Sequence, residues 1–206
     1  MDWLDVLDPD LTPEEVFRDK LPQLHRARRE QFCKFVSTSL IFSVKFIDAG
    51  DQYTLLMGPD EVRYERGAMI DFPQATIHGT VAQWSRSLKL ASELVVPADA
   101  QIDSYEGRIE LTESIKFDFE RFDGVLGVEI VELPDGGAPL TFDIILNDYE
   151  PPARAKRAKL VVEWSSLVEL AHGRISPVEA ARKVNVQGAM GLAFDIGGFA
   201  MREFDI

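Results

Sequence analysis

The segment 159–196 reads KLVVEWSSLVELAHGRISPVEAARKVNVQGAMGLAFDI and holds the densest structural signal in the chain. Its apolar, β-branched start predicts a buried strand, and the stretch from Trp164 predicts a helix that ends at Gly173. Pro177 opens a second short helix, and a further strand and a glycine-led apolar segment follow. Catalytic and metal-ligand motifs do not occur in this segment, so its signal concerns architecture rather than chemistry.

A weaker copy of this segment occurs earlier in the chain, at an offset of 80 residues. When the Trp-Ser pairs at Trp84 and Trp164 are aligned without gaps, four further positions are identical. Leu90, Ala91, Pro97 and Ala100 then match Leu170, Ala171, Pro177 and Ala180. The sequence therefore predicts a duplicated α+β unit of about 100 residues, which is an ordinary size for a small domain. We expect the two units to pack as a pseudo-dimer, as two subunits do across a two-fold interface.

The second copy resembles the sterol carrier protein type 2 (SCP2-like) domain in the patterns W-x-x-L-x-x-L-x-x-G, I-x-P-x-x-A and K-V-x-V-x-G. The residues that carry the resemblance are Trp164, Leu167, Leu170, Gly173, Ile175, Pro177, Ala180, Lys183, Val184, Val186 and Gly188. The first copy departs from the pattern, because Glu93 and Glu113 stand where the second copy has Gly173 and Gly188. The resemblance implies units with a mainly antiparallel sheet, covered on one side by helices and enclosing an apolar tunnel for lipids.

The resulting domain division is a tail at residues 1–11, a first SCP2-like repeat at 12–122 and a second at 123–206. The resemblance implies non-catalytic binding or transport of an apolar small molecule, of the lipid, sterol or fatty-acyl type, in a helix-covered cavity. Candidate lining residues are Phe32, Phe35, Phe42, Phe46, Leu55, Met57, Phe142, Ile144, Leu192 and Phe194. The alternative is that these side chains fill the core, which would make the chain a structural interaction module.

A further alternative is an enzyme, or an accessory protein to one, that acts on a hydrophobic metabolite such as a polyketide or terpenoid. His78, on a predicted strand before a helix, is the candidate for proton transfer. The three histidines lack the spacing of zinc sites, and Cys33 is the single cysteine. Nucleotide-binding and nucleophile motifs do not occur. We therefore expect neither a metal nor a cofactor, and catalysis stays open.

The N-terminal half is expected to begin with a capped helix and to continue as strands. Thr12, Pro13 and Glu15 form a capping-box pattern. Pro22 predicts a kink before the helix resumes over residues 26–36. Apolar runs then predict strands at 41–47, 53–57, 62–65 and 75–80, the first three as an antiparallel meander. Thr80 is placed to cap a helix that carries Val81, Trp84, Leu88 and Ala91 on one face.

The middle of the chain predicts a short linker helix at 98–104 and strands at 107–111 and 115–122. The last of these rests on the alternation of Ile115, Phe117 and Phe119 with polar residues. The apolar segments 128–133 and 140–146 flank a Pro-Asp-Gly-Gly turn, which predicts a hairpin.

The chain is acidic, with a net charge of −13 over 206 residues. Nucleic-acid binding needs a basic face that displaces counterions, so we expect no nucleic-acid partner. The charge also disfavours anionic membranes, and no apolar run reaches the ~18 residues that span a bilayer, so we expect no stable membrane insertion. The N-terminus lacks the features of a secretory signal. Together these features predict a cytoplasmic protein, as a monomer or a weak dimer.

Overall fold

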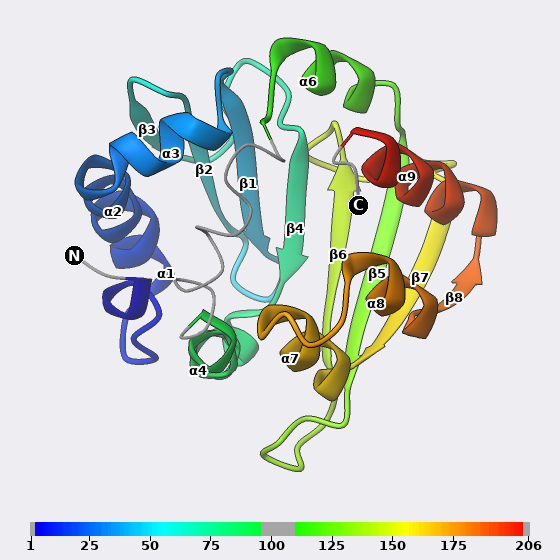
Figure 1. Cartoon of the computed structure of the whole chain (residues 1–206). Helices are drawn as coiled ribbons and strands as arrows, with labels where there is room; N and C mark the ends of the chain where they lie inside the picture. Colours follow the sequence, from blue (N-terminus) through cyan, green and yellow to red (C-terminus); the bar gives the residue numbers. More distant parts are fainter. Residues whose placement is uncertain (1–2, 96–109, 204–206) are drawn as a thin grey trace.

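One mixed sheet runs through the computed structural model, which describes residues 3–95 and 110–203 (Figure 1). Within these ranges the sheet has eight strands in the order β3-β2-β1-β4-β6-β5-β7-β8. Their bounds are β1 Leu40–Phe46, β2 Asp51–Met57, β3 Val62–Arg66, β4 Ala75–Gly79, β5 Gly124–Val131, β6 Leu140–Leu146, β7 Arg157–Glu163 and β8 Asn185–Gly188. The four N-terminal strands, the hairpin and the two C-terminal strands therefore confirm the predictions made for those segments.

Each half of the sheet contains a hairpin with a parallel strand beside it. β1 pairs antiparallel with β2 and parallel with β4, while β5 pairs antiparallel with β6 and parallel with β7. β4 and β6 join the halves in antiparallel pairing. β1 and β5 therefore run in the same direction, and the halves lie side by side along one sheet. The predicted α+β class is confirmed, but an arrangement of two separate units as a pseudo-dimer is not.

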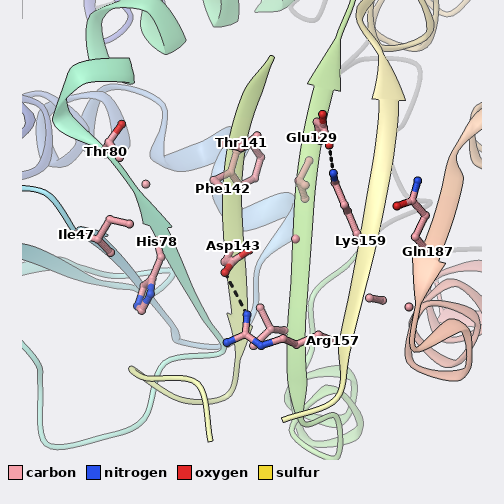
Figure 2. Close-up of a pocket in the computed structure, with 16 residues that line it drawn as sticks. Ile47, His78, Thr80, Glu129, Thr141, Phe142, Asp143, Arg157, Lys159 and Gln187 are labelled. Carbon is pink, nitrogen blue, oxygen red and sulfur yellow. Dashed lines mark hydrogen bonds and ion pairs between the residues drawn. The ribbon is translucent and has the colours of Figure 1, made fainter. Parts of the chain in front are cut away.

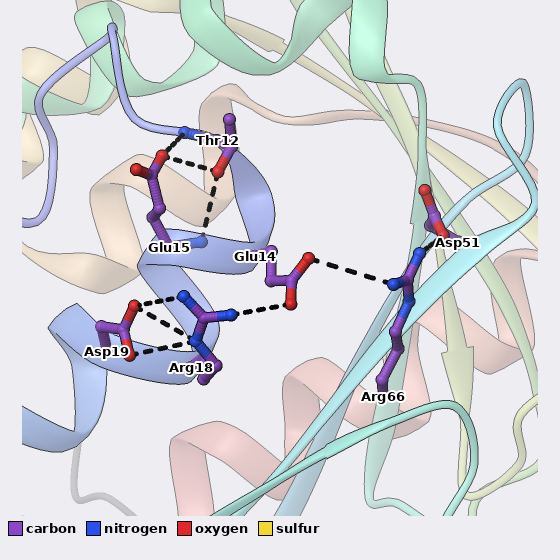
Figure 3. Close-up of polar contacts among 7 residues, drawn as sticks. All are labelled: Thr12, Glu14, Glu15, Arg18, Asp19, Asp51 and Arg66. Carbon is purple, nitrogen blue, oxygen red and sulfur yellow. Dashed lines mark hydrogen bonds and ion pairs between the residues drawn. The ribbon is translucent and has the colours of Figure 1, made fainter.

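The N-terminal helix begins at the predicted capping box (Figure 3). The Thr12 hydroxyl accepts a hydrogen bond from the Glu15 N–H at 3.3 Å, and the Glu15 carboxylate accepts one from the Thr12 N–H at 2.8 Å. The Thr12 hydroxyl also donates to the Glu15 carboxylate at 2.6 Å, and this hydrogen bond, together with that from the Thr12 N–H, lowers the pKa of Glu15. The helix runs through α1 Pro13–Glu15, a π-helical turn Val16–Lys20, α2 Leu21–Ala27 and α3 Arg29–Phe35. The π-turn ends just before Pro22, at the predicted interruption.

A chain of ion pairs joins this helix to the edge of the sheet (Figure 3). Arg18 lies 2.9 Å from Glu14 and 2.8 Å from Asp19. Glu14 also lies 4.0 Å from Arg66 of β3, which pairs with Asp51 of β2 at 2.7 Å. These groups are exposed, so they align the helix with the strands more than they stabilise the fold.

All the helices lie on one face of the sheet (Figure 1). The remaining ones are α4 Trp84–Val95, α6 Glu113–Phe119, α7 Trp164–Ala171, α8 Pro177–Lys183 and α9 Met190–Glu203, with short 3₁₀ turns at Trp3–Asp5 and Val81–Gln83. Helices α4 and α7 lie side by side at one end of the strands, and α6 and α9 lie at the other end. Apolar clusters join sheet and helices through Phe46 with Phe17, Leu140 with Trp164, and Leu126 with Leu192.

Residues 113–119 are helical, so the predicted strand at 115–122 is wrong. The Thr112 hydroxyl caps α6 by accepting a hydrogen bond from the Ile115 N–H at 3.3 Å. At the other end, the Asn147 side-chain amide donates to the Phe119 carbonyl at 3.0 Å. Ile115 and Phe119 also have the i, i+4 spacing of a helix, and Phe117 between them is exposed. The sequence of this segment fits both a strand pattern and a helix pattern. Hydrogen bonds at both ends, one of them from Asn147 just after β6, favour the helix.

Helix α4 is capped from a distant turn rather than by the expected Thr80. The Thr80 side chain makes no cap hydrogen bond. The Asp48 carboxylate, in the β1–β2 turn, accepts hydrogen bonds from the N–H groups of Val81 and Ala82 at 2.9 and 3.4 Å. These backbone hydrogen bonds lower the pKa of Asp48. The cap therefore depends on the fold and not on the local sequence.

Two expectations fall on the part of the chain between the described ranges. The linker helix at 98–104 and residues 107–109 of the next expected strand lie outside the described residues. Leu111, at the end of that expected strand, forms an isolated parallel bridge with Val36, which follows α3. This bridge brings the start of α6 close to the start of β1, where the apolar cavity described next is found.

Candidate functional site

An apolar cavity lies between the start of β1 and the helices α6 and α9. Its volume is about 220 Å³. Apolar side chains from the strand, from both helices and from the segment before α6 line it: Leu40, Phe42, Leu111, Ile115, Phe119, Ile196, Phe199 and Ala200. Phe42 is 39% exposed, so the cavity is open to solvent at this strand.

Three polar residues, Gln74, Thr112 and Lys116, border the cavity, but their polar atoms have partners elsewhere. The Gln74 side chain accepts a hydrogen bond from a β1 N–H at 2.7 Å and donates to Glu120 at 3.3 Å. The Thr112 hydroxyl caps α6, and the Lys116 ammonium lies 3.9 Å from Glu113. The walls therefore offer apolar contact, and a bound molecule has to match them through buried apolar surface.

Three phenylalanines hold α6 against α9 beside the cavity. The ring centroids of Phe119 and Phe122 lie 5.9 Å apart, and Phe199 lies 5.9 and 5.3 Å from them. Their tilted and edge-to-face geometry is favourable beyond the area that it buries. The cavity thus depends on a contact between two helices that are distant in sequence.

The residues predicted to line a cavity lie in several different places. Phe42 borders the apolar cavity, and Ile144 and Leu192 pack in the neighbouring cluster beneath α9. Phe46, Leu55 and Met57 belong to a separate cluster around Phe17. These three side chains are packed against other side chains, as the filled-core alternative expects.

Three further predicted lining residues, Phe32, Phe142 and Phe194, are not part of the apolar cavity. Phe32 packs on His25 with ring centroids 4.6 Å apart, and Phe194 on α9 is exposed. Phe142 borders a separate trough on the opposite face of the sheet, which is described below. Phe35 is the last residue of α3. The predicted lining residues thus lie on more elements than those that form the apolar cavity.

Sequence reasoning missed most of the residues that do line the cavity. Ile115 and Phe119 were assigned to a strand, and the i, i+4 spacing between them was the available signal for a helix. On α9, Ile196, Phe199 and Ala200 have the i, i+3, i+4 spacing of one helical face. That spacing shows a buried face, but not which strand or helix lies opposite it.

A trough of about 590 Å³, lined by both polar and apolar residues, crosses the opposite face of the sheet (Figure 2). Strand register places five of its residues in one row across β4, β6, β5, β7 and β8: His78, Asp143, Gly127, Lys159 and Gln187. Lys159 pairs with Glu129, and Arg157 lies 3.4 Å from Asp143. Gly127 makes room in the row, because a Cβ atom there would lie 3.2 Å from the Asp143 carboxylate.

His78, the candidate for proton transfer, lies in this trough with Asp143 as its cross-strand partner (Figure 2). Its Nε2–H donates a hydrogen bond to the Tyr149 carbonyl at 3.1 Å. Neighbouring side chains on a strand point to opposite faces, and the register of β1 with β4 places Phe42 level with Ala75. Phe42 and His78 therefore lie on opposite faces, and His78 does not reach a molecule in the apolar cavity.

Other candidate chemistry is sparse in the described ranges. They contain no group of three or more His, Cys, Asp or Glu side chains arranged to hold a metal ion. Cys33 is exposed, and its Sγ–H donates to the Pro59 carbonyl at 3.2 Å. Among the same residues, no helix is long and apolar enough to cross a bilayer.

No family model matches the chain, and no curated protein sequence matches it. The solution structure of the sterol carrier protein domain 2 of Helicoverpa armigera is similar with 19% identity and a TM-score of 0.32, over 57% of this chain and 90% of that domain. A double mutant of the sec-alkyl sulfatase PisA1 is similar with 15% identity and a TM-score of 0.32, over 54% of this chain and 16% of the sulfatase chain. Each match covers little more than half of this chain.

Proposed function

We propose that this chain binds an apolar small molecule, of the lipid, sterol or fatty-acyl type, in the cavity between β1, α6 and α9. The observation that carries the proposal is the wall of the cavity, where apolar side chains surround about 220 Å³ of open space. An apolar molecule is favoured in such surroundings, because its apolar surface is removed from water.

The size of the cavity limits how much of the ligand it holds. A volume of 220 Å³ is about that of seven molecules in liquid water, so the cavity has room for about seven methylene groups of a ligand. Seven buried methylene groups contribute about 6 kcal/mol, whereas association costs about 4–15 kcal/mol. Useful affinity therefore requires a ligand that also makes apolar contact beyond this volume, for example along the exposed ring of Phe42.

We further propose that residues 12–122 and 123–206 are SCP2-like units of a degenerate repeat that share one sheet. The support is the common order of elements: a hairpin, a strand parallel to its first strand, and a helix that begins at Trp84 or Trp164. The last helix of the first unit is α6, and the last helix of the second is α9. On this proposal the cavity lies where the final helices of the two units meet.

The test is native mass spectrometry of the purified protein with solvent extraction, followed by displacement of a fluorescent fatty acid. We expect a co-purified apolar molecule or saturable binding of the probe. The variant Ala200→Leu fills the cavity from α9 and should weaken probe binding at least about tenfold. Ala181→Leu makes the same change on the exposed surface of α8 and serves as the control. Absence of both ligand and probe binding, or equal binding by the two variants, would overturn the proposal.

The enzyme alternative needs a proton-transferring group other than His78 for any molecule in this cavity, because His78 lies on the opposite face of the sheet. The structural-module alternative predicts that Ala200→Leu, which removes the open space, leaves every measurable property except stability unchanged. The probe-binding experiment therefore separates binding in the cavity from a filled, purely structural core.

A further inference from the structure

Helix α9 is apolar on the side that faces solvent as well as on the side that faces the sheet. On its inner side Leu192 and Phe199 are buried, and Ile196 and Ala200 line the cavity. The outer side of a surface helix normally carries polar side chains, and a helix that is apolar all round is normally covered on every side. The outer side of α9 therefore has the composition of a contact surface.

Three large apolar side chains form a line along this outer side. Phe194 is 64% exposed, and Met190 and Met201 are each 49% exposed. Their spacing of i, i+4 and i+11 places them within about 40° of one another around a helix of 3.6 residues per turn. We call these three residues the outer stripe. Single exposed apolar side chains are ordinary on a protein surface, but three in line on one helix form a continuous patch.

Three glycines flank the outer stripe. Gly191, Gly197 and Gly198 lie within α9, where glycine is less favourable than alanine. A Cβ atom added at any of them would have open space around it, so packing within the described chain does not require glycine there. Glycine does allow the backbone of a second helix to approach closely. These positions therefore suit contact between α9 and another helix.

The charged residues beside the outer stripe have opposite signs. Asp195 and Arg202 are seven residues apart, so they lie on the same flank of α9, two turns from one another. Arg202 pairs with the neighbouring Glu203 at 2.8 Å, whereas the Asp195 carboxylate has no ion pair or hydrogen bond within residues 3–95 and 110–203. The other flank of α9 carries alanine and glycine and no charge.

An antiparallel pair of α9 helices, related by a two-fold axis near Gly198, matches these features. Such an axis sets each flank of the helix against the same flank of its partner. Asp195 then lies opposite the partner's Arg202, and Phe194 lies within one turn of the partner's Met201. The symmetry repeats each contact, so the surface is complementary to itself. A parallel pair would instead set the charged flank against the uncharged one.

We infer that the outer stripe joins two copies of this chain in an antiparallel two-fold dimer through α9. Charge complementarity selects a second copy as the occupant, because Asp195 and Arg202 find their opposite charges on the same surface of that copy. The helix has 14 residues, so it is about 21 Å long and about 10 Å wide. Two such helices bury less than the about 1,200–2,000 Å² of a stable interface, which predicts a weak dimer.

The test is sedimentation equilibrium of the full chain over a wide range of protein concentrations. Physiological ionic strength is used, because it screens the repulsion between two chains of net charge −13. We expect a concentration-dependent dimer. Phe194→Ser should raise the dimer Kd at least about tenfold, because it removes a large apolar side chain from the interface. Phe72→Ser is the matched control, since Phe72 is 65% exposed but lies in the loop 67–74 before β4.

Exchanging the charges tests the antiparallel arrangement. Asp195→Arg and Arg202→Asp should each raise the dimer Kd at least about threefold, since each sets like charges opposite one another. The double variant should restore the Kd to near its original value. Gly198→Leu should also weaken the dimer but leave Tm no lower, because its side chain meets open space in the single chain and leucine favours a helix.

A monomer at every concentration would overturn the inference, as would equal effects of Phe194→Ser and Phe72→Ser. A dimer that the double charge variant fails to restore, or that Gly198→Leu leaves intact, would place the contact elsewhere and would also overturn it. The inference does not depend on the proposed function. Ala200→Leu acts on the inner side of α9, so it should lose the fluorescent fatty acid and leave the dimer Kd unchanged.

Discussion

Helices α4 and α7 begin alike and end differently. Both begin with Trp-Ser after a strand, yet α4 Trp84–Val95 has 12 residues and α7 Trp164–Ala171 has 8. Gly173 adopts a left-handed conformation with φ of +64° just beyond the end of α7. At the matching position α4 has Glu93, a residue that favours helix continuation. The difference indicates that Gly173 ends α7 and so makes it the shorter helix.

The two helices also differ in what surrounds their tryptophans. Trp84 packs with Phe17 and Phe46, and its indole N–H donates to the Leu11 carbonyl at 2.8 Å. Trp164 packs with Leu140 and with Leu90 of α4 itself. One local motif therefore serves two environments: Trp84 anchors the N-terminal helix, and Trp164 anchors α7 against α4.

Replacing either tryptophan should have the largest effect. We expect Trp164→Ala and Trp84→Ala each to lower the free energy of unfolding by about 3–5 kcal/mol, because a large side chain is lost from a packed site. Urea denaturation followed by circular dichroism measures this. In Trp84→Ala we also expect more rapid proteolysis near residue 12, since Leu11 loses its hydrogen-bond partner. A loss below about 1 kcal/mol for either variant would show that the two helices are not anchored there.

Changing the glycine that ends α7 should have an intermediate effect. We expect Gly173→Ala to cost about 1–2 kcal/mol, because the left-handed conformation is unfavourable for a residue with a Cβ atom. The matched change Glu93→Ala on α4 should lie within about 0.5 kcal/mol of wild type, since alanine suits a helix at least as well. Thermal or urea unfolding measures both. Equal effects of the two changes would contradict the explanation given for the lengths of the helices.

The caps of the two helices offer a smaller contrast. Asp48, in the β1–β2 turn, caps the 3₁₀ turn Val81–Gln83 that leads into α4, whereas Glu163, directly before α7, makes no side-chain cap hydrogen bond. We expect Asp48→Ala to lower Tm by about 2–4 °C, and Glu163→Ala to leave Tm almost unchanged. Differential scanning calorimetry measures the two shifts. A larger shift for Glu163→Ala would mean that α7 depends on its own local cap after all.

The smallest expected effect concerns the ion pair that joins α4 to the β5–β6 turn. Hydrogen bonding to Arg86 holds the pKa of Asp135 at about 2, below its unfolded value near 4. A depressed pKa in the folded state contributes stability that is present above about pH 4 and is lost as the pH falls through about 2. In Asp135→Asn the urea midpoint should therefore change less with pH over this window. Arg86→Gln should show the same flattening, and a profile parallel to wild type in both variants would refute the assignment.

Local patterns predicted most elements of this fold, and they failed where two patterns competed. The capping box at Thr12 and Glu15 and the hairpin around residues 134–137 are local, because all their partners lie within a few residues. The segment from Ile115 to Phe119 satisfied both a strand and a helix pattern, and its caps decided the outcome. One of those caps comes from Asn147, which lies 28 residues beyond Phe119. No local rule includes that contact.

The apolar cavity was the least predictable part of the protein. The sequence indicated many apolar candidates, and one of them, Phe42, lies in the lining. Most of the others are packed in separate clusters, because apolar side chains of equal character fill a core or line a space according to what lies opposite them. The sequence contains the helical faces of α6 and α9, but their meeting through Phe119 and Phe199 is a tertiary event.

The sequence alone predicted the capping box at Thr12, the end of α7 at Gly173, the strands of the sheet, the acidic charge and the Trp-Ser correspondence of α4 and α7. These follow from backbone conformation and hydrogen bonding over short stretches of chain. Other features are seen only in the tertiary structure. Both halves share one sheet, and Asp48 caps the turn that leads into α4. Tyr149 is hydrogen-bonded to the loop before β4, and space remains between β1, α6 and α9. These features depend on contacts between distant segments, whose geometry is set by packing over the whole sheet.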